Sequence, residues 1–416
     1  AIYVLAQKYV EDLGASLKLE KTMDMSQALE GTDFVIHSAA PSYPDRYDLI
    51  TQIGEKHGYY RGIDSQEFNM VSTYSYILCS YPDLKLSSEI AELMEKLSPQ
   101  AYLLQTANPV FEATQFVSQS TGVKVIGFCH GFSGVFGAFH TLGLNPEEVD
   151  WQVAGVNHGI WLNRFLYRGE NAYPLLDKWI EEESQHWQPE NPWDVHLSPA
   201  VIDMYRFYGL LPVGDTCRNG TWKYNYNLDA KKKWYGKFGG IDNEVERPRF
   251  YEELRQRKRM MIELSKDPGI KLTKSWPEEF SKDKMSGEQQ IPFINAIVNN
   301  KATRLVLNIL NRGAIKGISD DVVVEIPLEV NGSGIHSEKI EPNLPDRILK
   351  YYLTPRITRM EMAVDAFTTG DRKILEELLV RDPRTENYED IPKLWNEIFS
   401  LPFNQEMKSH YSGAKI

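Results

Sequence analysis

Short apolar runs alternate with amphipathic segments of helical length through the first third of the chain. The apolar runs cover residues 34–36, 101–106 and 123–128, and the helical segments cover 45–56, 87–97 and 110–120. A further strand over 17–21 and a short helix over 25–30 are expected before them. Strands that alternate with helices of this length predict a parallel sheet with helices on both faces. We therefore expect an α/β fold with a doubly wound sheet.

Small and polar residues follow each of these apolar runs. Ser38, Ala39 and Ala40 lie just after the first run, Asn108 after the second and Cys129 after the third. In open parallel sheets, ligands bind beyond the carboxyl ends of the strands. These positions are therefore the first candidates for a functional site.

The N-terminal segment lacks the usual opening of a dinucleotide-binding fold. Residues 2–13 predict an amphipathic helix with no strand before it, and the early sequence has no G-x-G-x-x-G motif. Such folds open with a strand, a glycine-rich turn and a helix. Either the fold is different, or its first βαβ unit lies upstream of Ala1.

The pattern changes from Val149 onward. Antiparallel strand pairs are expected at 151–156 with 160–167, around Asn157-His158, and at 302–310 with 322–330, and helices are expected at 175–187 and 345–380. Paired strands followed by long helices are typical of an α+β unit. We expect a dinucleotide-binding domain over 1–150 and an α+β catalytic domain over 151–416.

Charge and composition narrow the possible partners. The formal net charge is −12, with acids and bases interspersed, so no basic face for nucleic acid is expected. No apolar stretch approaches bilayer length and no signal-peptide pattern opens the chain, so we expect no membrane partner. Cys79, Cys129 and Cys217 are too few for a disulfide framework and suit a reducing, cytoplasmic compartment.

Cys129, His130 and His158 form the sharpest group of candidate functional residues. A thiolate and an imidazole at strand ends suit a divalent metal such as manganese, nickel, cobalt or iron. Two protein ligands would leave coordination positions open for a substrate. The alternative is a buried cysteine and a satisfied core histidine, because cysteine is among the most buried residue types. Spacing alone leaves both interpretations open.

Two polar segments are weaker candidates. The amide of Asn108 could hold a ribose, a nicotinamide or a sugar hydroxyl, although Asn-Pro is also a common way to end a strand. The segment 214–219 carries Asp215 and Arg218, which could equally form a local ion pair in an ordinary turn. The lysine run 231–233 predicts a solvated face.

Several segments carry a resemblance to a known family. The sequence has RGID at 61–64, NP at 108–109, GFCHG at 127–131, VAGVNH at 153–158, GDT at 214–216, SGEQ at 286–289 and PDR at 345–347. Together they closely resemble glycoside hydrolase family 4 over nearly the whole chain. Residues 151–161 are most similar to the α-glucosidase branch. Other branches act on α-galactosides, α-glucuronides, α-galacturonides and 6-phosphoglucosides.

The resemblance implies a Rossmann-like fold of the lactate/malate dehydrogenase type, with its first strand and glycine-rich loop upstream of Ala1. It also implies an exception to two-carboxylate glycoside hydrolysis. NAD would take a hydride from C3 of the sugar, and Mn²⁺, Ni²⁺, Co²⁺ or Fe²⁺ would polarise the oxygens at C2 and C3. The C3 ketone acidifies the C2 proton, so a base can remove it and the glycosidic oxygen leaves by elimination. We expect a small glycoside as the substrate, exo action, and a homo-oligomer, either a dimer or a tetramer.

The resemblance also implies roles for the matching positions. Cys129 and His158 match the metal ligands, and Asp215 matches the carboxylate proposed as the base. Arg218 would orient Asp215 or bind substrate. The remaining matches are Asn108, His130 and Asn157 for the substrate and Ser38, Ala39, Ala40 and Asn108 for the cofactor.

One position departs from the α-glucosidase branch. That branch has an aspartate shortly after the segment that matches 69–72, and this aspartate protonates the leaving group. The present chain has Thr73-Tyr74 there. The acid then comes from elsewhere, with Asp64 the nearest spare carboxylate, or the enzyme depends on activated leaving groups.

Other functions stay open at this stage. The substrate could be an α-glucuronide or an α-galacturonide, and the chain could instead be a plain NAD-dependent oxidoreductase or a non-catalytic dinucleotide sensor. Cys129 with His158 favours the glycosidase over the oxidoreductase, because lactate and malate dehydrogenases need no metal.

Overall fold

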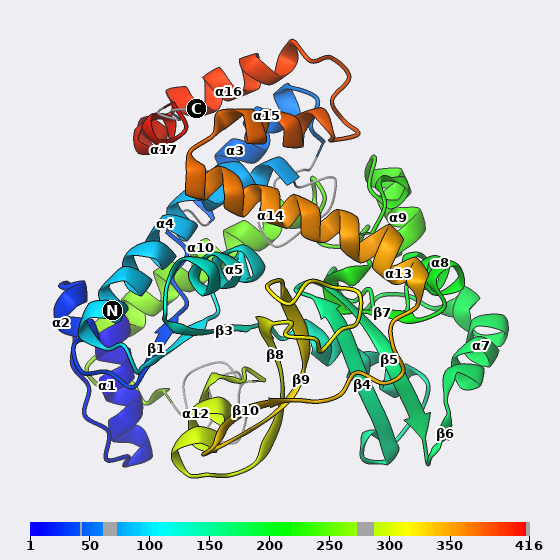
Figure 1. Cartoon of the computed structure of the whole chain (residues 1–416), viewed down its shortest axis with the longest axis horizontal. Coiled ribbons are helices and arrows are strands. Elements are labelled where there is room, and N and C mark those ends of the chain that lie inside the picture. Colours follow the sequence, from blue (N-terminus) through cyan, green and yellow to red (C-terminus); the bar gives the residue numbers. More distant parts are fainter. Residues whose placement is uncertain (42–43, 61–72, 219, 273–286, 413–416) are drawn as a thin grey trace.

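The computed structural model describes residues 1–41, 44–60, 73–218, 220–272 and 287–412, with the backbone alone for 73–80 (Figure 1). Its strands form one ten-stranded sheet. Three of them are the apolar runs predicted from the sequence: β1 (Phe34–His37), β2 (Tyr102–Gln105) and β3 (Lys124–Phe128). They pair in parallel, so the doubly wound part of the prediction is confirmed.

The rest of the sheet is antiparallel and continues from β3. In spatial order it contains β8 (Thr303–Leu310), β9 (Val323–Asn331), β4 (Val149–Val156), β5 (Gly159–Tyr167) and β6 (Glu170–Asn171), while β10 (Gly334–Ser337) pairs with β9 and β7 (Leu211–Val213) with β5. Both predicted antiparallel pairs are therefore present, β4 with β5 and β8 with β9. Because β3 pairs with β8, the parallel and antiparallel parts share one continuous layer.

Helices cover the sheet and extend beyond one side of it. They are α1 (Ile2–Leu13), α2 (Met25–Leu29), α3 (Asp45–Lys56), α4 (Thr73–Leu97), α5 (Val110–Ser120), α6 (Gly134–Thr141), α7 (Tyr173–Glu182), α8 (Pro199–Tyr208), α9 (Leu228–Tyr235), α10 (Glu246–Lys266), α12 (Gln290–Val298), α13 (Asp346–Ile348), α14 (Thr354–Thr369), α15 (Arg372–Val380), α16 (Asp390–Ser400) and α17 (Gln405–His410). The long helix α14 runs between the upper helices and the strands in Figure 1. It packs against α4, α5 and α15.

Two hydrophobic cores hold these layers together, and both draw residues from each side of residue 150. One lies around the antiparallel strands and includes Phe128 and Trp161. The other joins α3, α4 and α5 to the C-terminal helices, so that Tyr47 shares a cluster with Trp395. The division into 1–150 and 151–416 stays a proposal, and it does not separate the hydrophobic cores.

Two local expectations were wrong. The strand expected over 17–21 does not form, because these residues are largely exposed and no described strand pairs with them. Lys231 was expected on a solvated face, yet it is 2% exposed. Its ammonium donates to the Asn225 side chain at 3.2 Å, which provides a buried acceptor. Among the described residues, no helix is both long enough and apolar enough to cross a bilayer.

Candidate active site

Side chains from several strand ends meet at one edge of the sheet. Cys129 directly follows β3, and Asn157 and His158 form the tight turn between β4 and β5. Asp215 lies in a short 3-10 turn, Gly214–Thr216, directly after β7. Because β7 pairs with β5, this turn is held beside His158. The fold thus brings together residues that are separated by up to 86 positions in the sequence.

A polar row crosses the sheet beneath this cluster. Gly127 of β3 is in register with Asn308 of β8, Asn308 with Glu325 of β9, and Glu325 with Gly155 of β4. Asn308 and Glu325 are fully buried. A Cβ atom at Gly127 would lie only 2.8 Å from the Asn308 Cβ, so glycine is required for this close approach. The row places one buried carboxylate under the ends of the strands.

Glu325 is linked to Cys129 through Asn157. The Asn157 amide donates to Glu325 Oε2 at 2.9 Å, and the Asn157 side chain also lies beside the Cys129 thiol. Burial raises the pKa of Glu325 to about 7. Burial, followed by the nearby Glu325, also raises the pKa of the Cys129 thiol. Asn157, which was expected to bind substrate, is 3% exposed, and its amide is bound to Glu325.

His158 is held in a constrained backbone conformation. Its φ is 54°, a region that residues other than glycine rarely adopt. Arg356 of α14 donates to the Asn157 carbonyl at 2.7 Å and fixes the turn from behind. His158 Nε2 lies 3.7 Å from Asp215 Oδ2. This arrangement aims the imidazole at the carboxylate that the sequence identified as a candidate base.

A chain of alternating charges continues from Asp215. Arg218 Nη1 donates to Asp215 Oδ1 at 2.5 Å, and Arg218 also binds both oxygens of Asp242. Arg247 donates to Asp242 from the other side. Although burial opposes ionisation, Arg218 and His158 hold the pKa of Asp215 below its ordinary value. Asp215 is therefore ionised and held in one orientation. Its ion pair with Arg218 is not only a local contact within a turn, because Asp242 and Arg247 extend it into a buried network.

A cavity of about 310 Å³ opens beside Asp215. It is lined by His130, Gly131, Ser133, Gly134, Gly137, Trp193, Val195, His196, Gly214 and Asp215. Gly214 has a φ of 58°, and a Cβ there would lie 2.3 Å from the Gly131 carbonyl oxygen, so the two loops can meet only with glycine at 214. Trp193 is 40% exposed, and Arg218 lies 5.0 Å from its ring centre. The cavity therefore has an aromatic wall linked to the Asp215 network.

His130 is more exposed than the other candidates. Its Nδ1 lies 2.9 Å from Glu288 Oε1, with a side chain that is 70% exposed, and this contact raises the pKa of His130. The neighbouring Gln289 bridges Cys129 and β8, donating to the carbonyls of Cys129 at 3.3 Å and Val306 at 2.7 Å. The segment 287–289 thus supports the loop that carries Cys129 and His130.

The expected cofactor-binding residues follow β1 and β2. Ser38, Ala39 and Ala40 are exposed just beyond β1. Asn108 follows β2, and its buried Oδ1 has no hydrogen-bond partner in the described part of the chain. An unsatisfied buried amide oxygen at a strand end fits a polar ligand group that is bound there. Asp64 and the Thr73 side chain lie outside the described residues.

The metal prediction rests on two protein ligands. In the described ranges, no group of three or more His, Cys, Asp or Glu side chains is arranged to hold a metal ion. The loop that carries Cys129 nevertheless lies against the Asp215 turn, where Gly214 meets the Gly131 carbonyl, and Asp215 lies 3.7 Å from His158. A thiolate and an imidazole are a donor pair that suits a borderline divalent ion.

A mixed sheet whose parallel strands end beside this cluster, with helices packed on it, is typical of α/β enzymes with a Rossmann-like fold. The chain belongs to glycosyl hydrolase family 4. The family 4 glycosyl hydrolase model matches residues 1–143, and the model of the family's C-terminal domain matches residues 153–385. The recognition made from the sequence motifs is confirmed, and the chain is a glycoside hydrolase.

Curated relatives differ in their substrates. An α-galacturonidase from Thermoanaerobacter italicus is 23% identical, covering 95% of this chain and 87% of the relative. A 6-phospho-β-glucosidase from Escherichia coli is 24% identical, covering 84% and 73%. These relatives span different sugars and both anomers, so family membership leaves the substrate open.

Solved structures share the fold. A 6-phospho-α-glucosidase from gut microorganisms, in complex with NAD and Mn²⁺, has a TM-score of 0.70 at 19% identity, covering 98% of this chain and 88% of that one. A Thermotoga maritima 6-phospho-β-glucosidase with manganese, NAD⁺ and glucose-6-phosphate has a TM-score of 0.69 at 16% identity, covering 95% and 87%. At these identities the likeness establishes the Rossmann-like fold.

Three groups in the site were not found from the sequence. They are Glu325, Asp242 and Arg356, which respectively support Asn157, Arg218 and the His158 turn. Glu325 could have been singled out from the sequence, because it is the only charged residue in the otherwise apolar run 322–328. Asp242 and Arg356 lie in ordinary polar surroundings, and nothing in the sequence distinguishes them.

Proposed function

We propose that this chain is an exo-acting α-glycosidase of the α-glucosidase type that uses NAD and a divalent metal, Mn²⁺ being the first candidate. The observation that carries the proposal is the meeting of Cys129, His158 and Asp215 at the carboxyl edge of the sheet. NAD- and Mn²⁺-bound structural relatives of the same fold support the choice of cofactors.

Cys129 and His158 would hold the metal, with Asn157 and Glu325 fixing the thiol beneath it. Ser38, Ala39 and Ala40 would lie along the cofactor, and Asn108 would use its unsatisfied oxygen for the cofactor or a sugar hydroxyl. When bound, NAD would supply reversible hydride transfer at C3 of the sugar, and the metal would polarise the C2 and C3 oxygens.

Asp215 would remove the proton from C2 of the oxidised sugar. A carboxylate can do this because the C3 ketone makes that proton acidic, and Asp215 is ionised and oriented by Arg218. The electron pair of the broken C2–H bond then expels the glycosidic oxygen from C1. Water adds back at C1, and Asp215 returns a proton to C2. Asp64 stays a candidate for the acid that protonates the leaving group.

The cavity beside Asp215 favours a neutral sugar. A carboxylate or phosphate on the substrate would need a lysine or arginine within reach. The described residues that line the cavity include no lysine or arginine, and its two histidines, His130 and His196, each face a carboxylate, of Glu288 and Asp194. The adjacent Arg218 is bound by Asp215 and Asp242. The exposed part of the Trp193 ring offers an apolar face for the C–H groups of a sugar.

An α-galacturonidase is the second candidate, because such an enzyme matches 95% of this chain. The two candidates are separated by assaying aryl α-glucosides, α-glucuronides and α-galacturonides with NAD, Mn²⁺ and a reductant. We expect the α-glucoside to be hydrolysed fastest. Faster release from either uronide would reject the neutral-sugar proposal while leaving the mechanism intact.

The mechanism itself is tested by hydrolysis in heavy water. The sugar released should carry deuterium at C2, because the proton that Asp215 removes exchanges with solvent. Catalytic amounts of NAD should suffice, with no NADH accumulating. A product that retains its C2 hydrogen would exclude elimination, and one NADH per sugar would identify a plain oxidoreductase.

A further inference from the structure

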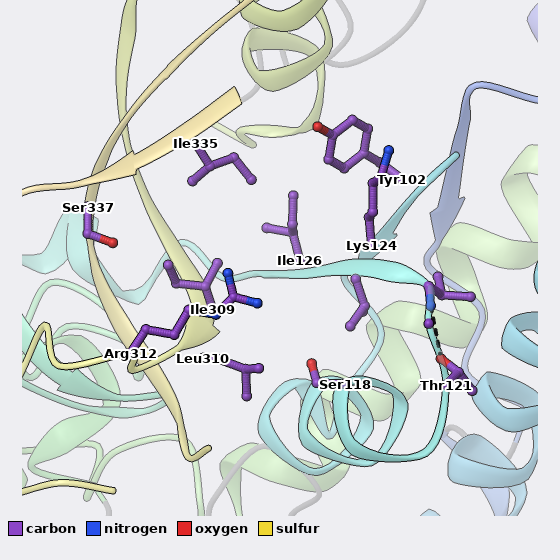
Figure 2. A pocket seen from close by; sticks show the side chains of 13 residues that line it. Tyr102, Ser118, Thr121, Lys124, Ile126, Ile309, Leu310, Arg312, Ile335 and Ser337 are labelled. Carbon is purple, nitrogen blue, oxygen red and sulfur yellow. Dashed lines mark hydrogen bonds between the residues drawn. The ribbon is translucent and has the colours of Figure 1, made fainter. Parts of the chain in front are cut away.

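A second cavity, of about 570 Å³, lies at the amino end of β3. Cys129 follows the opposite end of the same strand, so this cavity is separate from the candidate active site. Figure 2 shows side chains from β3, α5, β8 and β10 around it. Neither the family match nor the proposed reaction gives it a role.

The cavity forms because two neighbouring strands separate. β3 and β8 pair only at Gly127 with Asn308 and at Phe128 with Leu307. Beyond these pairs β8 continues beside β9, while the first residues of β3 stay with β2. Ile126 of β3 and Ile309 of β8 would be the next pair, and both line the gap instead. The opening is therefore built into the sheet.

The charged groups of this cavity are all basic. Among the described residues that line it, Lys124 and Arg312 are the ones that carry charge, although the whole chain has a net charge of −12. Arg312 lies in the β8–β9 turn with a φ of 44°, and Figure 2 shows its guanidinium turned toward the cavity. The Asn311 side chain, hydrogen-bonded to the carbonyls of Ile315 and Ile318, holds this turn.

Lys124 approaches from the facing side. Its ammonium lies 3.1 Å from Gln100 Oε1 and 3.2 Å from the Gln100 carbonyl oxygen, which leaves one N–H for a ligand. It also lies 5.4 Å from the centre of the Tyr102 ring, whose edge helps to line the cavity. Between the two cations, the floor is aliphatic, with Ile126, Ile309 and Ile335.

We propose that this cavity binds a small organic anion. Its acidic group, a carboxylate or a phosphate, is held by Arg312, since a guanidinium can donate two parallel hydrogen bonds to either group. Lys124 adds a second positive charge on the facing side of the cavity. Its apolar body covers the three isoleucines. Hydroxyl groups of Tyr102, Ser118 and Ser337 line the same cavity and offer further hydrogen bonds.

Calorimetric titration of the intact protein tests the proposal with phenyl phosphate, 3-phenylpropanoate and the uncharged benzyl alcohol. We expect at least one anion to bind saturably and the alcohol not to bind. The double variant Lys124→Gln/Arg312→Gln should bind the anion about 10- to 100-fold more weakly, because the bidentate guanidinium contact and the second positive charge of the cavity are both lost. Both side chains are exposed, so the variant should fold.

Two further variants locate the binding. Lys316→Gln removes an exposed charge from the same turn and should bind the anion like the wild type, as should Asp215→Asn in the candidate active site. The proposal is overturned if neither anion binds at millimolar concentration, if the double variant binds as tightly as the wild type, or if Asp215→Asn abolishes binding. None of these results bears on the proposed glycosidase reaction.

Discussion

Arg218 donates to Asp215 at 2.5 Å while its remaining N–H groups bind both oxygens of Asp242. The guanidinium is therefore fixed on two sides and cannot follow Asp215 if that carboxylate turns away. With a side chain that is 3% exposed, Arg218 acts on Asp215 with little screening by water. The pair keeps the candidate base ionised and aimed into the cavity.

Replacing Asp215 with asparagine should lower kcat by about 10² to 10⁴, because a general base contributes a factor of that order. Binding of NAD, measured by fluorescence titration, should change little. Asp150→Asn, which alters an exposed carboxylate that pairs with Arg164, is the matched control. Near-wild-type turnover in Asp215→Asn would reduce Asp215 to a turn residue. Tyr226, which is 51% exposed, would then be a better candidate base than Tyr224, whose hydroxyl is bonded to Asp203.

Replacing Cys129 with serine should remove the bound metal and the activity together, because a hydroxyl is a far weaker ligand than a thiolate for a borderline metal. Metal content per protein chain is the direct measurement. Cys217→Ala is the matched control, since Cys217 is the other cysteine whose side chain the structure describes and it is packed among the apolar residues of the core. If Cys129→Ser retained its metal and its turnover after treatment with a chelator, Cys129 would be an ordinary half-buried cysteine and not a metal ligand.

Replacing Trp193 with alanine should raise KM for the preferred glycoside by about 10-fold, the amount expected when roughly 1.4 kcal/mol of apolar contact is lost. The effect on kcat should be smaller, since Asp215 stays bound to Arg218. Phe207→Ala is the control, because Phe207 is also an exposed aromatic residue with an arginine, Arg347, over its ring. An unchanged KM in Trp193→Ala would show that the sugar binds elsewhere in the cavity.

Stability should fall with rising pH because of Asp83. This carboxyl is 2% exposed, and burial raises its pKa to about 7. Between about pH 4 and 7 the folded protein therefore holds a proton that the unfolded chain has lost, so stability decreases across this window and levels off above it. The shift of about three pH units corresponds to at most roughly 4 kcal/mol.

Asp83→Asn should remove the part of this pH dependence that Asp83 contributes, because the amide is neutral and can still accept the hydrogen bond from Tyr47. The part contributed by Glu325, whose pKa is also raised to about 7, should remain. Thermal unfolding at pH 5 and pH 8 measures it, and the variant should gain most over the wild type at pH 8. The exposed Asp177→Asn serves as the control. Equal gains at both pH values would show that Asp83 is not the group that titrates.

Much of the site was predictable because its main residues lie at strand ends. The spacing of apolar residues can be recognised within a few residues of sequence, so β2, β3, β4 and β5 could be located. The positions that follow them, Asn108, Cys129 and the Asn157-His158 turn, could then be located as well. The residues that hold these site residues in place could not be predicted from the sequence. Glu325 reaches Asn157 only through the register of β9 against β4, and register depends on pairing between distant segments.

Other errors have similar physical causes. The segment 17–21 has the local pattern of a strand, but a strand forms only where a neighbouring strand can pair with it. The residues near 17–21 in the sequence do not show whether such a neighbour exists. Lysine runs usually lie in solvent, but Lys231 is buried because the Asn225 side chain provides a hydrogen-bond acceptor for its ammonium in the core. Arg356 lies on a helix whose rotation about its axis decides whether the guanidinium meets solvent or the His158 turn.

The row from Gly127 through Asn308 and Glu325 to Gly155 has a consequence for how this enzyme can be recombined. Each member is in register with its neighbour across β3, β8, β9 and β4. The strand that leads to Cys129 and the strand that leads to His158 are therefore tied into one hydrogen-bonded layer. A chimera that joins the first 150 residues to the remainder of a relative would have to reproduce this register, or the two metal-ligand candidates would no longer face each other.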